Sequence, residues 1–391
     1  MKAALVYFTE ISKTVGHIGG SEILLFLVIK ELQARGYSVT VALQSGGDVD
    51  KGSRDYGIAI DTEKIQTIHL NECGGILRCI NRHLKFWWQW RLRHLGPRFD
   101  VCISCANPVD FGHPGIHFVH MLTLDERFKA DFWNECTSGW KLIRNRLVFA
   151  RDSIVAFLAG VRMPAKIVRD AKEVVLANSN HAKACIESYY KCKIHEAFYP
   201  PTVFEPVIAK AASSSNCDIA YIGRFEPEKR VDDLVEIVRI AREKSGIDFS
   251  LRLAGKCPDT EDGNRIRDLV SCYSWVSLEG TVRGENKASF LASCRFALHG
   301  CKVEAFGISV TEYIKAGLVP IVPREGGSSE VVGLSDLVYS DNDGAANILI
   351  WLVKDEAFYC KCAKHCQERA KIFSAVAYIE RQTRLLDELG V

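Results

Sequence analysis

The stretch from Glu304 to Glu330 constrains the fold of this chain more than any other part of the sequence. It opens with an acid and a Phe-Gly pair, and a short helical pattern follows that ends at Gly317, a residue type that commonly closes a helix. Leu318–Val322 is an apolar run typical of a buried strand, and Pro323 and the glycines after it end that run. Another helix is expected from Ser328. The stretch therefore predicts two loop-to-helix junctions, one on either side of a buried strand.

Such junctions suit the diphosphate of a nucleotide. A glycine at the start of a helix lets the backbone approach a phosphate, and the free N–H groups and the helix dipole favour its negative charge. Glu304 and Glu312 cannot serve the phosphates, because like charges repel. They are better placed to accept hydrogen bonds from the hydroxyls of a ribose and of a sugar. The alternative is an ordinary α/β unit whose acids are solvated.

The spacing Glu304-x7-Glu312 becomes specific through the residues around it, which are Phe306-Gly307, Gly317, Pro320 and Gly326-Gly327-x-x-Glu330. With them the chain resembles the retaining glycosyltransferases of family 4, and most of all the mannosyltransferase-like members that act on lipid-linked acceptors. The resemblance implies the α/β GT-B fold, in which two Rossmann-like domains enclose a cleft. It also implies that Glu304 contacts the donor sugar and Glu312 the ribose. The diphosphate would contact the backbone around Phe306, Gly307 and Ile308.

A loop in the second half of the chain supplies cations. Asp218–Ile222 is predicted as a strand, and Arg224 and Lys229 lie in the loop at its C-terminal end. The family has an Arg and a Lys at this place that hold the pyrophosphate, and a bidentate Arg with a point-charge Lys suits that task. Solvated loop charge is the alternative. In the family the loop that begins at residues 281–283 passes the nucleotide base, which adds Arg283 to the donor-binding residues.

The first half opens with a βαβ pattern. Lys2–Phe8 is predicted as a strand, Ser21 to about Arg35 as a helix, and Ser38–Leu43 as a second strand. Gly19 and Gly20 lie in the turn before the helix and match the family's usual first loop, which faces the cleft. The resemblance therefore includes both glycines in the donor site.

His120, in the first half of the chain, is a further candidate for catalysis. Asp100–Ser104 is predicted as a strand, and His117 and His120 follow another short apolar strand. Family members that act on lipid-linked acceptors commonly carry a His here, near the donor sugar, and His120 matches it best. A hydrogen-bonded structural His is the alternative. Cys102 and Cys105 form a C-x-x-C without a second pair, which is typical of core thiols.

A predicted helix at residues 76–95 carries several basic residues and no acid. Phe86 and Trp90 lie off its core face, roughly 200° and 240° from Leu84 at about 100° per residue. Exposed aromatics on a basic helix suit an anionic membrane surface, and the alternative is that they pack under a neighbouring loop. The basic helical segment at residues 139–172 adds weak support, because most helical charge is only a solvated face.

The composition limits which partners the protein is expected to bind and in which cell compartment it is expected to lie. The 391 residues carry a formal net charge of +2, too little for a chain that is basic throughout, and we expect no nucleic-acid partner. Fifteen cysteines without a secretory signal are typical of reduced thiols in a cytoplasmic protein. No apolar run reaches membrane-spanning length, so any membrane contact is expected to be peripheral, on the inner face.

No metal or other cofactor is expected. Asp341-Asn342-Asp343 looks like a metal-binding D-x-D, but it follows a strand and precedes a helix, so we interpret it as a turn and helix cap. A second group of possible metal ligands lies on one predicted helix without a partner cluster. Its members are Cys360, Cys362, His365 and Cys366.

The sequence therefore predicts an acceptor-side domain at residues 1–209, a nucleotide-sugar-binding domain at 210–372, and a last helix at 373–391 that crosses back. The expected reaction moves a hexose from a UDP- or GDP-linked donor to a hydroxyl acceptor with retention of configuration. Arg224, Lys229 and the helix amides near Gly307 would stabilise the departing diphosphate. A sugar-nucleotide 2-epimerase of the same fold is one alternative, and it needs acid–base groups and no acceptor. A non-catalytic partner subunit is the other, and the presence of both glutamates and both cations argues against it.

Overall fold

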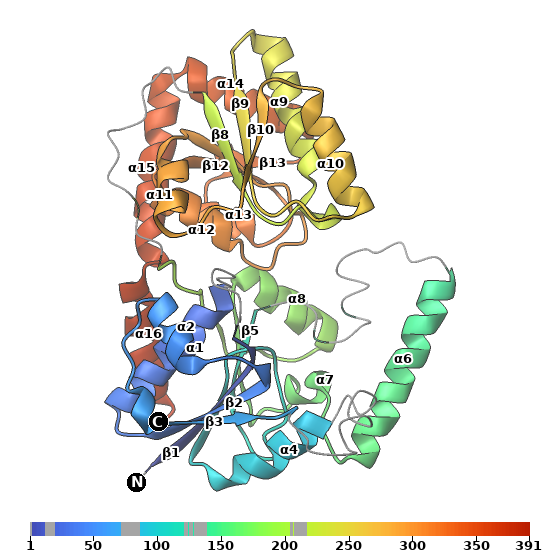
Figure 1. The fold of residues 1–391 in the computed structure, drawn as a ribbon, viewed down its shortest axis with the longest axis vertical. Coiled ribbons are helices and arrows are strands. Elements are labelled where there is room, and N and C mark those ends of the chain that lie inside the picture. Colours follow the sequence, from blue (N-terminus) through green and yellow to red (C-terminus); the bar gives the residue numbers. More distant parts are fainter. Residues whose placement is uncertain are drawn as a thin grey trace. The chain divides into compact units, whose positions relative to one another are not determined.

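The computed structural model describes residues 2–11, 20–71, 87–120, 124, 128, 139–203, 206 and 217–391. The chain divides into two compact units, which Figure 1 draws as a ribbon. Unit 1 contains Met1–Pro201 and Ile379–Val391, and unit 2 contains Thr202–Tyr378. The sequence placed the boundaries at residues 209–210 and 372–373, and the former lies outside the described residues.

Unit 1 is built on a seven-stranded parallel sheet in the order β3-β2-β1-β4-β5-β6-β7. Its strands are β1 (Ala3–Glu10), β2 (Ser38–Gly46), β3 (Ile65–His69), β4 (Val101–Ser104), β5 (Ile116–Val119), β6 (Val174–Ala177) and β7 (Glu196–Ala197). Every residue of β4 and β5 is buried, as expected for strands inside a parallel sheet. The edge strand β3 buries no residue, and the sequence did not predict it.

The same unit contains the following helices. They are α1 (Gly20–Ala34), α2 (Val49–Asp55), α4 (Trp87–Leu95), α6 (Gly139–Leu158), α7 (Pro164–Ile167), α8 (Asn180–Tyr190) and most of α16 (Ala375–Glu388), with 3₁₀ turns at Thr62–Lys64 and Gly96–Arg98. The C-terminal helix α16 packs on α1, where Arg35 forms an ion pair with Asp387 at 2.8 Å (Figure 1). Gln382 Nε2 also donates to the carbonyl oxygen of Leu27 at 3.4 Å.

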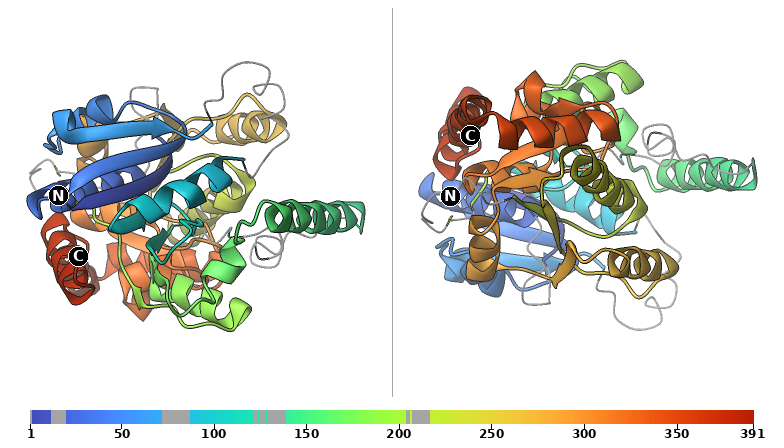
Figure 2. Two further views of the ribbon diagram at one scale, coloured as in Figure 1. Left: turned by 90° about the horizontal axis from the view of Figure 1, so that it is seen from below. Right: turned by 90° about the horizontal axis from the view of Figure 1, so that it is seen from above.

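Unit 2 is built on a six-stranded parallel sheet in the order β10-β9-β8-β11-β12-β13. Its strands are β8 (Asp218–Ile222), β9 (Ser250–Ala254), β10 (Val276–Gly280), β11 (Phe296–Leu298), β12 (Val319–Pro323) and β13 (Val338–Tyr339). Its helices are α9 (Val231–Ser245), α10 (Glu261–Ser271), α11 (Gly284–Ala292), α12 (Ile308–Lys315), α13 (Ser328–Val332), α14 (Asn342–Lys354) and α15 (Glu356–Ile372), with 3₁₀ turns at Pro227–Lys229 and Ser335–Leu337. Helices α9 and α14 pack side by side (Figure 2).

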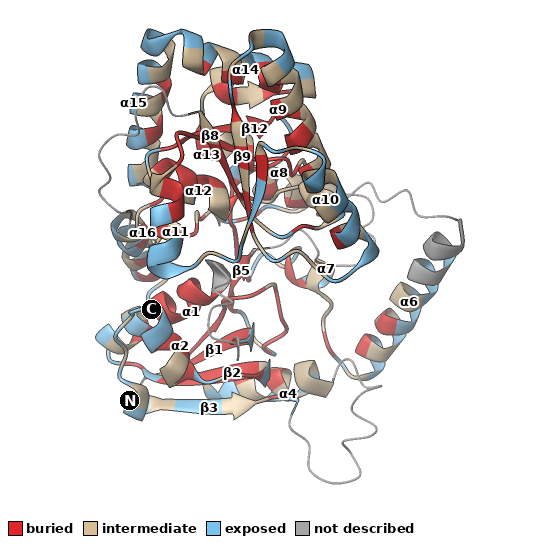
Figure 3. Cartoon of the chain, turned by 45° about the horizontal axis from the view of Figure 1, so that its top comes forward, coloured by how far each residue is buried: buried red, intermediate tan, exposed pale blue. Residues whose placement is uncertain are grey.

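Both sheets share one doubly wound order. Counted along each unit, the strands lie in the order 3-2-1-4-5-6, and β7 extends the edge of the first sheet. The order reverses between β1 and β4 in unit 1 and between β8 and β11 in unit 2. Buried residues concentrate in the strands of both sheets (Figure 3). The predicted fold class of two Rossmann-like α/β domains is confirmed, and sheets of this order bind ligands beside the carboxyl ends of the strands at such switch points.

Local predictions are confirmed where short-range signals decide the structure. The strands β6 and β8 coincide with the predicted apolar runs, and Asp341 caps α14 by accepting from the N–H of Gly344 at 2.7 Å. The prediction for His117 is wrong, because this residue lies inside β5 and is fully buried rather than following the strand. Among the described helices, none combines the length and the apolar character needed to cross a bilayer.

Candidate functional site

Two loops of unit 2 meet at the carboxyl ends of β8 and β11, on the two sides of the switch point. The loop after β8 carries Lys229, and the loop after β11 carries His299 and Glu304. Lys229 Nζ donates to Glu304 Oε2 at 2.7 Å, and His299 Nε2 lies 3.5 Å from the same oxygen. The structure thus places in direct contact two residues that the sequence assigned to one site, and it adds a buried histidine.

Close backbone packing holds these loops together. A Cβ atom on Gly300 would lie 2.7 Å from the carbonyl oxygen of Lys229, so a larger residue would push the two loops apart. A Cβ atom on Gly327 would lie 2.2 Å from the carbonyl oxygen of Ala305. The N–H of Gly327 also donates to the backbone oxygen of Glu304 at 2.7 Å. The glycine pair near the end of the 304–330 stretch therefore fixes the position of Glu304.

The Lys229–Glu304 contact is an ion pair in a partly buried setting. Burial alone would raise the pKa of the Glu304 carboxyl, but the neighbouring His299 ring and the charge and hydrogen bond of Lys229 outweigh burial and hold this pKa well below its usual range. Burial lowers the pKa of Lys229, yet the charge of Glu304 outweighs it and the net pKa is raised. The site therefore presents a carboxylate and an ammonium at neutral pH.

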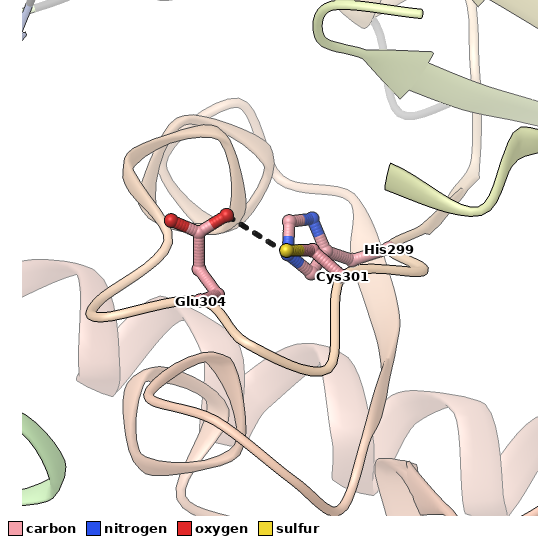
Figure 4. A group of neighbouring side chains, drawn as sticks. All are labelled: His299, Cys301 and Glu304. Atoms are coloured by element: carbon pink, nitrogen blue, oxygen red, sulfur yellow. Dashed lines mark ion pairs between the residues drawn. The ribbon is translucent and has the colours of Figure 1, made fainter. Parts of the chain in front are cut away.

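Figure 4 shows His299, Cys301 and Glu304 grouped at this site, with their potential ligand atoms all within 4.8 Å of one another. Imidazole, thiolate and carboxylate are groups that Zn²⁺ accepts as ligands. Lys229, however, already places a positive charge on Glu304. Burial also raises the pKa of the Cys301 thiol to about 11, so the thiol is protonated at neutral pH. The cluster as it stands is organised around an ammonium group.

Helix α12 begins directly after the Phe-Gly pair. Gly307 caps its N-terminus with φ = 104°, a conformation that favours glycine. Phe306 is 2% exposed and packs edge-on against Phe373, with ring centroids 5.5 Å apart, so only its backbone can contact a ligand. The N–H groups of Ile308 and Ser309 lie in the first turn, where donors have no acceptor within the helix. These amides can receive an anion.

The second glutamate pairs with a lysine that the sequence did not predict. Lys287 Nζ, on α11, donates to Glu312 Oε1 on α12 at 2.6 Å, and both side chains are largely buried. The hydroxyl of Tyr313 accepts from the N–H of Ile222 at 2.6 Å, which fixes α12 beside the strand that leads into the Lys229 loop. Both halves of the E-x7-E motif thus carry an ammonium partner.

Two other predicted donor residues are more exposed. Arg224 lies in the same loop as Lys229, but its side chain is 64% exposed and pairs with Glu226 at 2.7 Å and Glu228 at 3.4 Å. Arg283 is exposed and immediately precedes α11. Their contacts with pyrophosphate and base stay predictions.

Unit 1 has a cavity of about 290 Å³ at its own switch point. Its lining includes Phe8, Trp88, Gln89, Asn107 and His120, from the ends of β1, β4 and β5 and from α4. Trp88 stacks on the ring of Tyr7 at 5.4 Å. Within the described part of the chain, His120 Nε2, Asn107 Oδ1 and Gln89 Oε1 are buried without a hydrogen-bond partner. These polar atoms can bind hydroxyl groups inside a mostly apolar space.

The two candidate histidines differ in environment. Burial lowers the pKa of His120 to about 4, so this ring is neutral at physiological pH. His117 lies outside the cavity lining, and its Nε2 is 2.9 Å from Glu173 Oε2, in a buried network that Arg162 extends to Asp110. His117 therefore has a structural role, and His120 is the histidine that lines the cavity.

The surface expected to meet a membrane is only partly available. Phe86 lies outside the described residues. Of the two glycines predicted for the donor site, Gly19 also lies outside them, and Gly20 begins α1. Trp90 is 37% exposed and packs against Trp87 of its own helix. Arg91 donates to two backbone oxygens at the end of β3, and Arg93 pairs with the buried Asp110 at 2.5 Å. Much of the basic charge predicted for lipids on α4 thus stabilises unit 1 instead.

The second half of the chain, which contains these site residues, matches the model of a known protein family. Residues 209–373 match the family described as Glycosyl transferases group 1. The matched segment contains every candidate site residue of unit 2. The resemblance seen in the sequence is therefore confirmed for the second half of the chain.

Two curated relatives illustrate the range of the similarity. The chain is 28% identical over 175 residues to the GDP-Man:Man(3)GlcNAc(2)-PP-Dol alpha-1,2-mannosyltransferase of Yarrowia lipolytica, covering 39% of this chain and 27% of that protein. It is 27% identical over 164 residues to the N-acetyl-alpha-D-glucosaminyl L-malate synthase of Bacillus anthracis, covering 40% of this chain and 41% of that protein. The chain thus spans less than half the length of these relatives.

A solved structure matches over nearly the full chain. The crystal structure of Anabaena HepE in complex with UDP and glucose has a TM-score of 0.67 and 15% sequence identity, covering 99% of this chain and 100% of that one. At this identity the likeness concerns the fold.

Proposed function

We propose that this protein is a retaining glycosyltransferase that moves a hexose from a UDP- or GDP-linked sugar to a hydroxyl group of a lipid-linked glycan or glycolipid. The observation that carries the proposal is the Lys229–Glu304–His299 cluster at the switch point of a domain that belongs to a glycosyltransferase family. Fixed charge at that place is what a nucleoside diphosphate needs.

The diphosphate is assigned to Lys229, Arg224 and the first turn of α12. Lys229 uses one N–H on Glu304 and has two further donors for phosphate oxygens. Arg224 carries an exposed guanidinium on the same loop and can exchange its surface partners for a bidentate contact with phosphate. The amides of Ile308 and Ser309, after Gly307, add the positive end of a helix dipole.

The two glutamates are assigned to hydroxyl groups of the donor. Glu304 would accept from the transferred hexose, next to the cation that holds the phosphate. Glu312 would accept from the ribose through Oε2, since Lys287 holds Oε1. Arg283 and the Gly19-Gly20 turn would complete the donor contacts, as they do in the family.

In the reaction the bond between the anomeric carbon and the phosphate oxygen breaks, and the acceptor oxygen bonds to that carbon on the same face. The acceptor's proton passes to the departing phosphate oxygen. Negative charge grows on the diphosphate, and Lys229 and Arg224 stabilise it. Because these cations are part of the protein, we infer that the reaction needs no metal.

The acceptor is assigned to the cavity of unit 1. Its apolar walls and the Trp88 ring suit the face of a sugar, and the neutral His120 and Asn107 offer hydrogen bonds to hydroxyls. A lipid-linked acceptor is supported by the mannosyltransferase relative, whose name includes a dolichyl-diphosphate-linked glycan. Such an acceptor would make the protein peripheral on the cytoplasmic face of a membrane.

The test is incubation with a panel of UDP- and GDP-hexoses, with and without a polyprenyl-diphosphate-linked oligosaccharide. We expect slow release of nucleoside diphosphate from one donor alone, and faster release with acceptor. NMR of the product should show the anomeric configuration of the donor. Conversion of the donor to its 2-epimer without acceptor would identify an epimerase instead. Binding of no nucleotide sugar at all would favour a non-catalytic subunit.

A further inference from the structure

Helix α6 turns large apolar side chains toward solvent. They are 50% to 77% exposed, and they are Ile143, Leu147, Ile154, Phe157 and Leu158. A surface helix of a globular protein normally turns such residues toward the core. Helix α9 follows that rule, because the residues it buries are all apolar. Helix α6 does the opposite on one side.

The exposed side chains of α6 form one continuous stripe. At about 100° per residue, all five lie within an arc of about 100° around the helix. Asp152 and Ala156 are 4% and 1% exposed and lie roughly 180° and 220° from Ile143. The stripe is therefore opposite the buried face of α6 and is not the side by which the helix packs. We refer to the five residues as the α6 stripe.

Positive charge borders the α6 stripe. Arg146 and Arg151 are exposed, and they lie about 60° from Ile143 on one side and about 80° on the other. Asp152 is the one acid in the sequence of α6, and it is buried and paired with Arg151 at 2.9 Å. The exposed surface is thus apolar in the middle and carries an arginine at each edge, and Asp152 offsets the charge of Arg151.

We propose that the α6 stripe docks this protein on an anionic lipid surface, with the helix lying in the plane of the interface. An apolar centre reaches the acyl boundary, while arginines at the edges contact anionic headgroups. A second copy of the chain fits less well, because a symmetric pairing of stripes would bring the arginine edges of both copies together. This proposal rests on the proposed function in one respect: a lipid-linked acceptor gives the protein a reason to bind a membrane.

This surface differs from the one that the sequence indicated around Trp90. On α4, Trp90 packs against its own helix, and Arg91 and Arg93 are bonded within unit 1. On α6, Phe157 and Leu158 are each 77% exposed. The periodicity of α6 alone could not reveal this, because both of its sides carry apolar residues.

The experiment is flotation of the full chain with phosphatidylcholine vesicles, with and without phosphatidylglycerol, at low and high salt. The test variant is Phe157→Ser with Leu158→Ser. The matched control is Trp351→Ser with Val376→Ser, which removes two apolar side chains that are 63% and 65% exposed outside α6. Arg146→Gln keeps the apolar stripe and removes one charge at its edge. Circular dichroism verifies that each variant folds.

We expect the wild type and the control to float with anionic vesicles and to detach at high salt. The double α6 variant should partition at least about tenfold more weakly, because two large side chains no longer leave water. Arg146→Gln should weaken binding only to anionic vesicles. Equal flotation of the α6 variant and the control would overturn the proposal. So would a wild type that does not bind, or that forms a dimer which the α6 variant abolishes.

The proposed function fails separately from this proposal. UDP and GDP titrated into the α6 variant should bind as they do to the wild type, because the stripe lies in unit 1 and the residues assigned to the diphosphate, the hexose and the ribose lie in unit 2. Loss of vesicle binding with intact nucleotide binding supports the stripe. Vesicle binding without nucleotide binding by either protein contradicts the donor site alone.

Discussion

The two switch points of this molecule have the same strand order and opposite chemistry. In unit 2 the ends of β8 and β11 carry Lys229 and Glu304 as an ion pair, with a buried His299 beside them. In unit 1 the ends of β1 and β4 border a mostly apolar cavity, and the histidine in its lining, His120, is kept neutral by burial. The shared topology thus determines where a ligand can bind, and the side chains determine which ligand it is.

The difference indicates a division of labour. A fixed cation beside a carboxylate suits the charged, polar donor, whose leaving group gains negative charge in the reaction. An apolar cavity with unpaired neutral hydrogen-bonding atoms suits an uncharged ring with hydroxyl groups. Variants in the two regions should therefore affect different steps, and the following experiments can contradict that separation.

The largest effect is expected from Lys229→Ala. This variant removes the fixed cation of the leaving-group site, so kcat should fall by about 10²- to 10³-fold, while the Kd for the nucleoside diphosphate rises less. Lys244→Ala is the matched control. Lys244 lies in the last turn of α9, outside the two site loops, and pairs with Asp343 at 2.6 Å. A full-rate Lys229→Ala enzyme would mean that the ion pair is structural.

A smaller effect is expected from His120→Gln. Glutamine keeps a neutral hydrogen-bonding group, so the variant should lower kcat/KM for the acceptor by about tenfold and leave the Kd for UDP or GDP unchanged. Because His120 is already neutral above about pH 5, its loss should not alter the slope of the pH–rate profile between pH 6 and 8. A changed nucleotide affinity would contradict the separation of the two regions.

The same histidine should affect stability at acid pH. Its pKa of about 4 in the folded protein lies below the usual 6.5, so the unfolded chain binds more protons between these values. The stability is complete above about pH 6.5 and falls as the pH drops toward 4. Between pH 7 and 5.5 the loss is about 1 kcal/mol for the wild type. Urea titrations should show a smaller loss for His120→Gln, and identical losses would mean that the ring is not buried as a neutral group.

No effect is expected from a chelator. Lys229 already supplies the positive charge next to Glu304, so EDTA should leave the transfer rate unchanged. Heat-inactivated enzyme and a manganese-dependent transferase serve as controls for the assay. Activity that EDTA abolishes and zinc restores would place an ion on His299, Cys301 and Glu304.

Much of unit 2 could be predicted from sequence because its signals are local. The apolar run of β8, the glycine that caps α12 and the spacing of Glu304 and Glu312 all act over a few residues. Lys287 could not be predicted, because its bond to Glu312 joins two helices and depends on how they pack. His299 had one signal, its place directly after β11.

Unit 1 was harder to predict for the same physical reason. His117 sits in an apolar run and looked like a residue after a strand, but it is inside β5 and its Nε2 pairs with Glu173, which lies 56 positions away in the sequence. The arginines of α4 looked free for lipid, and only the fold brings Asp110 to Arg93. Long-range ion pairs leave no periodic signal in the chain.

Isothermal titration with UDP and GDP tests most directly the claim that the charged switch point of unit 2 binds the donor. The wild type should bind one of the two nucleotides. Glu312→Gln should weaken that binding by about tenfold or more, since a charge-assisted hydrogen bond to the ribose is lost. His120→Gln, in unit 1, should bind like the wild type. Binding of neither nucleotide by the wild type, or equal affinity in Glu312→Gln, would contradict the account.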